Sequence, residues 1–80
     1  MKLSQGSFDL ERFKETKKLL GKKVIDVKMF DGVKLICEDE SWLMLRPSGT
    51  EPLVRVYSES RSQTRAKQLI QYGDKLVRRK

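Results

Sequence analysis

The segment from Arg46 to Pro52 has the residue types of a phosphate-binding loop. Gly49 allows backbone N–H groups to converge on an anion, and Ser48 and Thr50 flank it with hydroxyl donors. The guanidinium of Arg46, at the entrance of the loop, can bind two phosphate oxygens at once. An ordinary turn would account for the glycine and the prolines, but not for the arginine and hydroxyls around them. The segment therefore predicts binding of a phosphate group.

Two further charged residues lie close to this segment. Arg55 follows it on a predicted strand, where alternation places Arg55 on the same polar face as Tyr57. Arg55 is therefore a second candidate, either for phosphate contact or for an ion pair with another domain. Glu51 would repel a bound dianion, so we expect its carboxylate to point outward and to orient Arg46 or Arg55.

The surrounding periodicity predicts the elements that hold this loop. Alternating or continuous apolar residues predict four strands, which begin at Val24, Val33, Trp42 and Leu53. A three-residue loop, Phe30-Asp31-Gly32, is favoured over a two-residue one because the shorter loop would place charge opposite the apolar face. The expected cross-strand pairs are Met29 with Val33, Val27 with Leu35 and Ile25 with Cys37.

Helical spacing predicts two helices. The first covers Phe8 to Leu20 and ends at Gly21, so that the lysines around this glycine would decorate a helix C-terminus. The second begins after Ser60 and Gln63, whose types match a capping box, and Gly73 within it indicates a close approach to the sheet.

These elements predict an α+β domain: a four-stranded antiparallel sheet with two helices packed on one face. We expect residues 1–7 to form a flexible leader and residues 8–80 to form the domain. The 80 residues leave no room for a second full domain, and no stretch is apolar enough to span a membrane. The sequence is typical of a cytoplasmic protein.

Composition excludes several kinds of chemistry and leaves one rival function. Histidine is absent and Cys37 is the single cysteine, so neither a His-dependent nucleophile nor a structural zinc site can form, and Cys37 is expected to be buried. The net charge of +7 favours anionic partners. A small basic nucleic-acid-binding module, using Trp42, Tyr57 and Arg55 on an open sheet face, therefore remains an alternative.

The segment Leu43–Glu59 closely resembles the phosphate-binding loop and following strand of the C-terminal, fourth domain of α-D-phosphohexomutases. Asp31-Gly32-Val33-Lys34 and Trp42 also resemble that family's hairpin and strand. The loop is most similar to bacterial phosphoglucomutase/phosphomannomutase, with phosphoglucosamine mutase as the alternative. The resemblance implies a TATA-binding-protein-like fold.

The resemblance also implies a role within a larger enzyme. Arg46, Ser48, Gly49 and Thr50, with Arg55, would hold the non-reacting phosphate of a hexose phosphate or hexose 1,6-bisphosphate. The domain would close the cleft while phosphate moves between C1 and C6. The active-site phosphoserine and Mg²⁺ would belong to upstream domains, so this chain is expected to carry no catalytic or metal-binding residue and to be inactive alone. Its protein partners would be those upstream domains, with no nucleic acid and no membrane.

Overall fold

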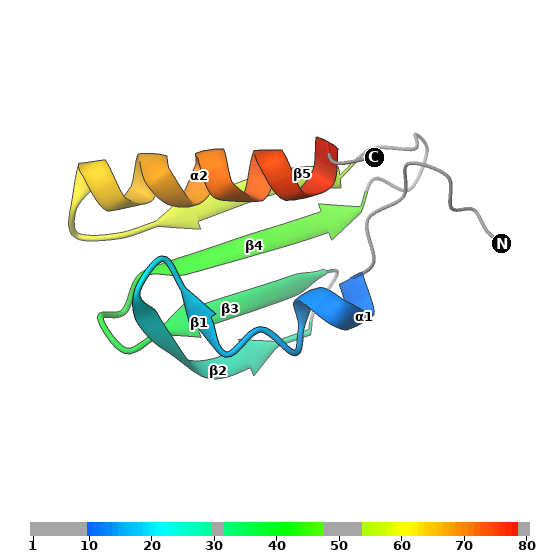
Figure 1. Ribbon diagram of the computed structural model, residues 1–80, viewed down its shortest axis with the longest axis horizontal. Helices are drawn as coiled ribbons and strands as arrows, with labels where there is room; N and C mark the ends of the chain where they lie inside the picture. The colour runs from blue at the N-terminus through cyan, green and yellow to red at the C-terminus, as the bar shows by residue number, and fades with distance from the viewer. Residues whose placement is uncertain (1–9, 30–31, 48–53, 79–80) are drawn as a thin grey trace, which may run out of the picture.

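The computed structural model describes residues 10–29, 32–47 and 54–78. Within these ranges the chain forms two helices and five strands (Figure 1). In chain order they are α1 Leu10–Phe13, β1 Lys18–Leu19, β2 Lys22–Lys28, β3 Val33–Cys37, β4 Trp42–Pro47, β5 Val54–Glu59 and α2 Gln63–Arg78. The strands form one antiparallel sheet in sequence order. The predicted α+β class is confirmed, but the sheet has five strands rather than four.

The extra strand arises where a single helix was predicted over residues 8–20. The α1 helix ends at Phe13, and Lys18–Leu19 pairs with the start of β2. Leu20 and Gly21 form the two-residue turn between these strands, with φ of 46° and 86°, the positive values that a type I′ hairpin requires. Gly21 therefore shapes a hairpin rather than ending a helix. The neighbouring lysines lie exposed on that hairpin, not at a helix C-terminus.

The register between β2 and β3 is only partly as predicted. Val27 lies opposite Leu35, as expected, but Val24 rather than Ile25 lies opposite Cys37. The register shifts between Val24 and Asp26, so Ile25 is the extra residue of a β-bulge and is 60% exposed. Alternation alone does not reveal such an insertion. The pairs Val27–Leu35 and Lys28–Lys34 have the register predicted for Met29 and Val33, but β2 ends at Lys28, so the strand pairing stops one residue before Met29.

The core lies on the inner face of the curled sheet. Apolar side chains from β3 and β4 join Phe13 of α1, Leu19 of β1 and Leu69 of α2 in one hydrophobic cluster. Both helices therefore cover a common core, with α2 packed on β4 and β5. Gly73 of α2 lies so close to β5 that a methyl group on it would be 2.8 Å from Val56 Cγ1. Cys37 is fully buried in this core, as predicted.

The start of α2 uses a different cap from the predicted one. The helix begins at Gln63, and the Ser62 hydroxyl accepts a hydrogen bond from the backbone N–H of Arg65 at 3.2 Å. The Ser60 hydroxyl accepts instead from the N–H of Ser62, at 3.1 Å, and so shapes the approach to the helix. The N-cap is therefore Ser62, two residues later than the capping box predicted.

The turn between β3 and β4 contains a residue in an unfavourable conformation. The N–H of Glu40 donates to the carbonyl of Cys37 at 2.9 Å, and Glu40 has a φ of 71°. Glycine reaches this left-handed region without the steric cost that glutamate incurs. We expect Glu40→Gly to raise the free energy of unfolding by about 0.5–1 kcal/mol, measured by urea denaturation. Glu40→Ala is the matched control, because it removes the same carboxylate without relieving the backbone; equal effects from both variants would refute this explanation.

The two ends of the sheet differ in what they carry. At one end lie the end of β2, the start of β3, the end of β4, the start of β5 and the last turn of α2 (Figure 1). At the other end lie the β1–β2 turn, the β3–β4 turn and the first turn of α2. The antiparallel pairing fixes this arrangement, so Pro47 and Val54, which flank the predicted phosphate loop, lie at the opposite end of the sheet from the β3–β4 turn.

Candidate functional site

The structure places the two predicted arginines side by side. Arg46, near the end of β4, is directly opposite Arg55, near the start of β5. Residues directly opposite in an antiparallel pair have their side chains on the same face, with Cβ atoms about 5 Å apart. Both arginines are exposed. The pairing therefore places two arginine side chains next to each other on one face, where β4 ends and β5 begins.

Strand alternation directs this pair away from the core. Leu45 is fully buried on the inner face, so Arg46, its neighbour, projects from the outer face that α2 does not cover. Arg55 and Tyr57 alternate with the half-buried Val54 and Val56 in the same way, as predicted. The arginines therefore lie on an open sheet face.

No carboxylate among the described residues neutralises this pair. Neither Arg46 nor Arg55 has an aspartate or glutamate oxygen within 4 Å in that part of the chain. Like charges directly opposite each other on a sheet are destabilising. A bound dianion would remove this repulsion, and two guanidinium groups could each donate paired hydrogen bonds to it.

The other predicted site residues fall on a segment that the structure does not describe. Ser48, Gly49, Thr50 and Glu51 lie within residues 48–53, outside the described ranges. Their expected roles at the phosphate therefore remain predictions. Of the six predicted site residues, the structure describes the two arginines and brings them together.

Trp42 also lies on the outer sheet face, but a cation already covers one side of its ring. The Lys34 ammonium is 4.2 Å from the centroid of the indole. Such a cation–π contact occupies a ring face that a nucleic acid base would use for stacking. One face of the Trp42 ring is therefore already occupied, which weakens the nucleic-acid alternative.

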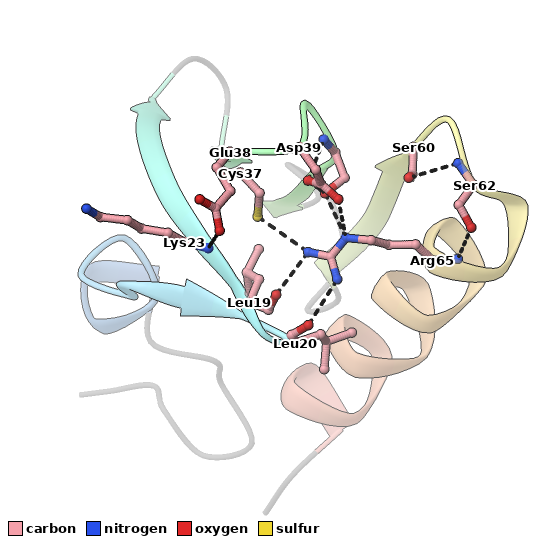
Figure 2. A network of polar contacts seen from close by, with 10 residues as sticks. Leu19, Leu20, Lys23, Cys37, Glu38, Asp39, Ser60, Ser62 and Arg65 are labelled. Carbon is pink, nitrogen blue, oxygen red and sulfur yellow. Dashed lines mark hydrogen bonds and ion pairs between the residues drawn. The ribbon is translucent and has the colours of Figure 1, made fainter.

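A polar network that the sequence analysis missed closes the opposite end of the sheet (Figure 2). It is centred on Arg65 of α2, whose side chain is only 11% exposed. The guanidinium donates to the carbonyls of Leu19 and Leu20 in the β1–β2 turn, at 2.9 and 3.2 Å. Its Nε lies 2.9 Å from Ser41 Oγ and 3.0 Å from Asp39 Oδ2, both in the β3–β4 turn. One side chain thus joins two turns to the helix.

Asp39 is held by the same network. Both the hydroxyl and the backbone N–H of Ser41 donate to Asp39 Oδ1. The Ser41 hydroxyl, followed by the Ser41 N–H and the charge of Arg65, keeps the pKa of the Asp39 carboxyl below its ordinary value, although burial opposes this shift. Asp39 is therefore a charged structural partner of Arg65, far from the arginine pair.

The signal for Arg65 is present in the sequence. Arg65 is four residues before Leu69, so the two share one stripe of the helix, and Leu69 is fully buried. A charged residue on the apolar stripe of a helix indicates a buried partner.

One further surface feature of the described residues is an open groove beside α2. Among the described residues, no group of three or more histidine, cysteine, aspartate or glutamate side chains could hold a metal ion. In that same part of the chain, no helix is long and apolar enough to cross a membrane. An open groove of about 500 Å³ between Leu20 and α2 is lined by Gln68, Gln71, Tyr72 and Lys75, and it includes neither of the paired arginines.

Comparison with known proteins identifies relatives with the same region. Residues 8–73 match the family described as "Phosphoglucomutase/phosphomannomutase, C-terminal domain". A phosphoglucomutase/phosphomannomutase of Thermococcus kodakarensis is 39% identical over 59 residues, and a phosphoglucosamine mutase of Methanococcus aeolicus is 42% identical over 60. These matches cover 74% and 72% of this chain. A phosphopentomutase of T. kodakarensis is 32% identical over 65 residues, or 81% of the chain.

The chain spans only 13–14% of the length of these relatives. All three come from archaea, which corrects the expected closeness to bacterial enzymes. No solved structure matches the chain significantly. The family match extends over most of the 80 residues and includes β4, β5 and the connection between them. The chain therefore belongs to the family of phosphoglucomutase/phosphomannomutase C-terminal domains.

Proposed function

We propose that this domain holds the non-reacting phosphate of a sugar phosphate at the β4–β5 connection. The observation that carries the proposal is the direct pairing of Arg46 with Arg55 at the mouth of that connection. The two cations repel each other in the free protein, and a phosphate dianion between them would replace this repulsion by charge-assisted hydrogen bonds. Anion binding is thus the chemistry that this arrangement favours.

In the proposal, the loop residues complete the site. Ser48 and Thr50 donate hydroxyl hydrogen bonds, and Gly49 allows backbone N–H groups to approach the phosphate oxygens. Glu51 points outward and orients one of the arginines rather than touching the anion. None of these groups attacks the substrate or transfers a proton, so the site orients and retains the sugar phosphate.

The proposal extends to a role in a larger enzyme. Binding energy from a remote phosphate can align the reacting end of the sugar, and closure of the domain over the cleft would exclude water. Upstream domains would supply the phosphoserine and Mg²⁺ for phosphoryl transfer between C1 and C6. Residues 8–80 would form the TATA-binding-protein-like domain of this cytoplasmic enzyme; the predicted leader, residues 1–7, lies outside the described residues. Without its partner domains, the chain would have no mutase activity.

The sugar is a separate question from the phosphate. The names of the relatives include hexose, hexosamine and pentose phosphomutases. A site that grips only a phosphate is compatible with all three, because it makes no contact that depends on the sugar ring. We propose a hexose phosphate or hexose 1,6-bisphosphate as the ligand, with glucosamine phosphate as the alternative.

A titration of the 80-residue chain with glucose 1,6-bisphosphate, followed residue by residue by NMR, tests the proposed site. We expect shifts at Arg46, Arg55 and the amides of residues 48–50, with a dissociation constant on the order of millimolar because the other domains are missing. Arg46→Ala should weaken this binding at least about tenfold, since it removes a charge-assisted contact.

Arg61→Ala is the matched control. Arg61 is also an exposed arginine, but it lies beyond β5 at the opposite end of the sheet, where its side chain is 85% exposed. This variant should bind the bisphosphate as the wild type does. Equal weakening by both substitutions would mean that the ligand responds only to net charge. Shifts confined to Trp42, Tyr57 and the basic C-terminus on addition of an oligonucleotide would instead support nucleic-acid binding.

A further inference from the structure

Gly32 lies directly against the backbone of the first arginine of the pair. It immediately precedes β3, whose first residue, Val33, is opposite Leu45 of β4. A methyl group on Gly32 would lie 2.5 Å from the carbonyl oxygen of Leu45, 2.9 Å from Cα of Arg46 and 3.1 Å from its Cβ. These separations are too short for any side chain, so only glycine fits at this position without movement of the neighbouring strand.

The need for glycine here comes from contact rather than from its backbone dihedral angles. The φ of Gly32 lies outside the left-handed region, whereas Gly21 has a φ of 86°. Alanine could therefore adopt this conformation, but two of the three atoms in its way are main-chain atoms of Leu45 and Arg46. A main-chain obstacle cannot rotate aside as the end of a side chain can. A substitution at Gly32 must therefore displace the β2–β3 connection or the end of β4.

We propose that Gly32 is a positioning residue for the phosphate site, an inference that rests on the proposed function. The backbone at Arg46 is held from two sides, by the close approach of Gly32 and by pairing with Arg55. These contacts fix where the Arg46 side chain leaves β4, and hence where its guanidinium can meet the anion. Gly32 itself touches no ligand; its lack of a side chain keeps the first arginine in register with the second.

A second crowded glycine in the same domain provides a matched comparison. A methyl group on Gly73 would lie 2.8 Å from Val56 Cγ1 and 3.1 Å from Leu43 Cδ1. Both contacts are with side chains on the inner face of the sheet, away from the arginine pair. Alanine at either glycine overfills its surroundings, but only alanine at Gly32 presses on Arg46. The pair of variants therefore separates a local effect on the site from a general loss of stability.

The test is a titration of the chain with inorganic phosphate at constant ionic strength, followed by NMR at the Arg46 and Arg55 signals. It compares the wild type with Gly32→Ala, Gly73→Ala and Arg46→Ala at a temperature where each is folded. We expect Gly32→Ala to weaken phosphate binding about tenfold, as expected for one charge-assisted hydrogen bond lost. Gly73→Ala should keep wild-type affinity within about twofold, although its melting temperature should fall at least as far as that of Gly32→Ala.

The variants distinguish a wrong role for Gly32 from a wrong phosphate site. Wild-type affinity in Gly32→Ala, with weak binding in Arg46→Ala, would overturn the role of Gly32 and leave the phosphate site standing. Equal losses in Gly32→Ala and Gly73→Ala would also overturn it. Unchanged affinity in Arg46→Ala would remove the proposed site and the inference with it. If Gly32→Ala does not fold, the comparison is made in a Glu40→Gly background, whose substitution lies at the far end of the sheet.

Discussion

Replacement of Arg65 by methionine should lower the free energy of unfolding by about 3 kcal/mol, measured by urea denaturation. Methionine preserves much of the length of the side chain but has no donor. The carbonyls of Leu19 and Leu20 and the carboxylate of Asp39 would therefore lose their shared partner. For a domain of this size, the melting temperature should fall by on the order of 15 °C.

The expected size of this effect follows from burial. Removing one partner of a buried ion pair typically costs about 3–5 kcal/mol, because the other charge is left uncompensated. Arg65 is 11% exposed but Asp39 is 28% exposed, so water can replace part of the lost interaction at the carboxylate. We therefore expect a value at the low end of that range. The total stability of an 80-residue domain is about 4–12 kcal/mol, so this one side chain accounts for a large part of it.

Two further variants test whether the guanidinium itself is responsible. Arg61→Met removes an arginine that pairs with Glu40 at the same end of the sheet, but with side chains that are 85% and 69% exposed. This variant should lower the free energy of unfolding by less than about 0.5 kcal/mol. Arg65→Lys keeps the charge but not the planar guanidinium. We therefore expect it to show most of the loss of stability expected for Arg65→Met. An Arg65→Met protein within 1 kcal/mol of the wild type would contradict the structural role assigned to this network.

Much of the fold is predictable because the signals are periodic over many residues. The α2 helix carries a stripe of apolar residues over four turns, and β4 and β5 alternate around Leu45 and Val56. The buried position of Cys37 and the close approach of Gly73 follow from the same patterns. These elements were predicted correctly because burial of one face determines each of them.

The N-terminal part was predicted wrongly because its signals are short and ambiguous. A two-residue strand such as β1 is too short to show alternation, and the apolar residues at positions 10, 13 and 20 match helical spacing by chance. The structure buries Leu19 and leaves Leu20 43% exposed, the opposite of the helical interpretation. Gly21 is consistent with a helix end and with a hairpin turn. Because β1 pairs with β2, it forms the turn.

The candidate site was predictable in composition but not in geometry. The sequence identifies Arg46 and Arg55 as candidates, yet nine positions separate them, and their adjacency depends on the register between β4 and β5. The contact of Gly32 with Arg46 depends on a third strand and is invisible to any local pattern. Arg65 could have been singled out from its place beside Leu69, but its partners in two distant turns could not.

Phosphate should stabilise the wild-type chain far more than an Arg55→Gln variant. Glutamine keeps a polar, though shorter, side chain on β5 and removes the charge opposite Arg46. At phosphate about 100 times above the wild-type dissociation constant, the free energy of unfolding should rise by about 2.7 kcal/mol. A tenfold loss of affinity reduces this gain to about 1.4 kcal/mol in the variant. Urea denaturation with and without phosphate, at constant ionic strength, measures both values.

The same variant should behave in the opposite way when phosphate is absent. Relief of the repulsion between Arg46 and Arg55 should raise the free energy of unfolding of Arg55→Gln by a few tenths of a kcal/mol. Arg61→Gln, with an exposed arginine at the other end, should show neither change. A phosphate effect that is equal in all three proteins would indicate general screening of the +7 charge rather than a site. A gain without the anion and a loss with it would mean that the domain tolerates an unfavourable cation pair because a phosphate completes it.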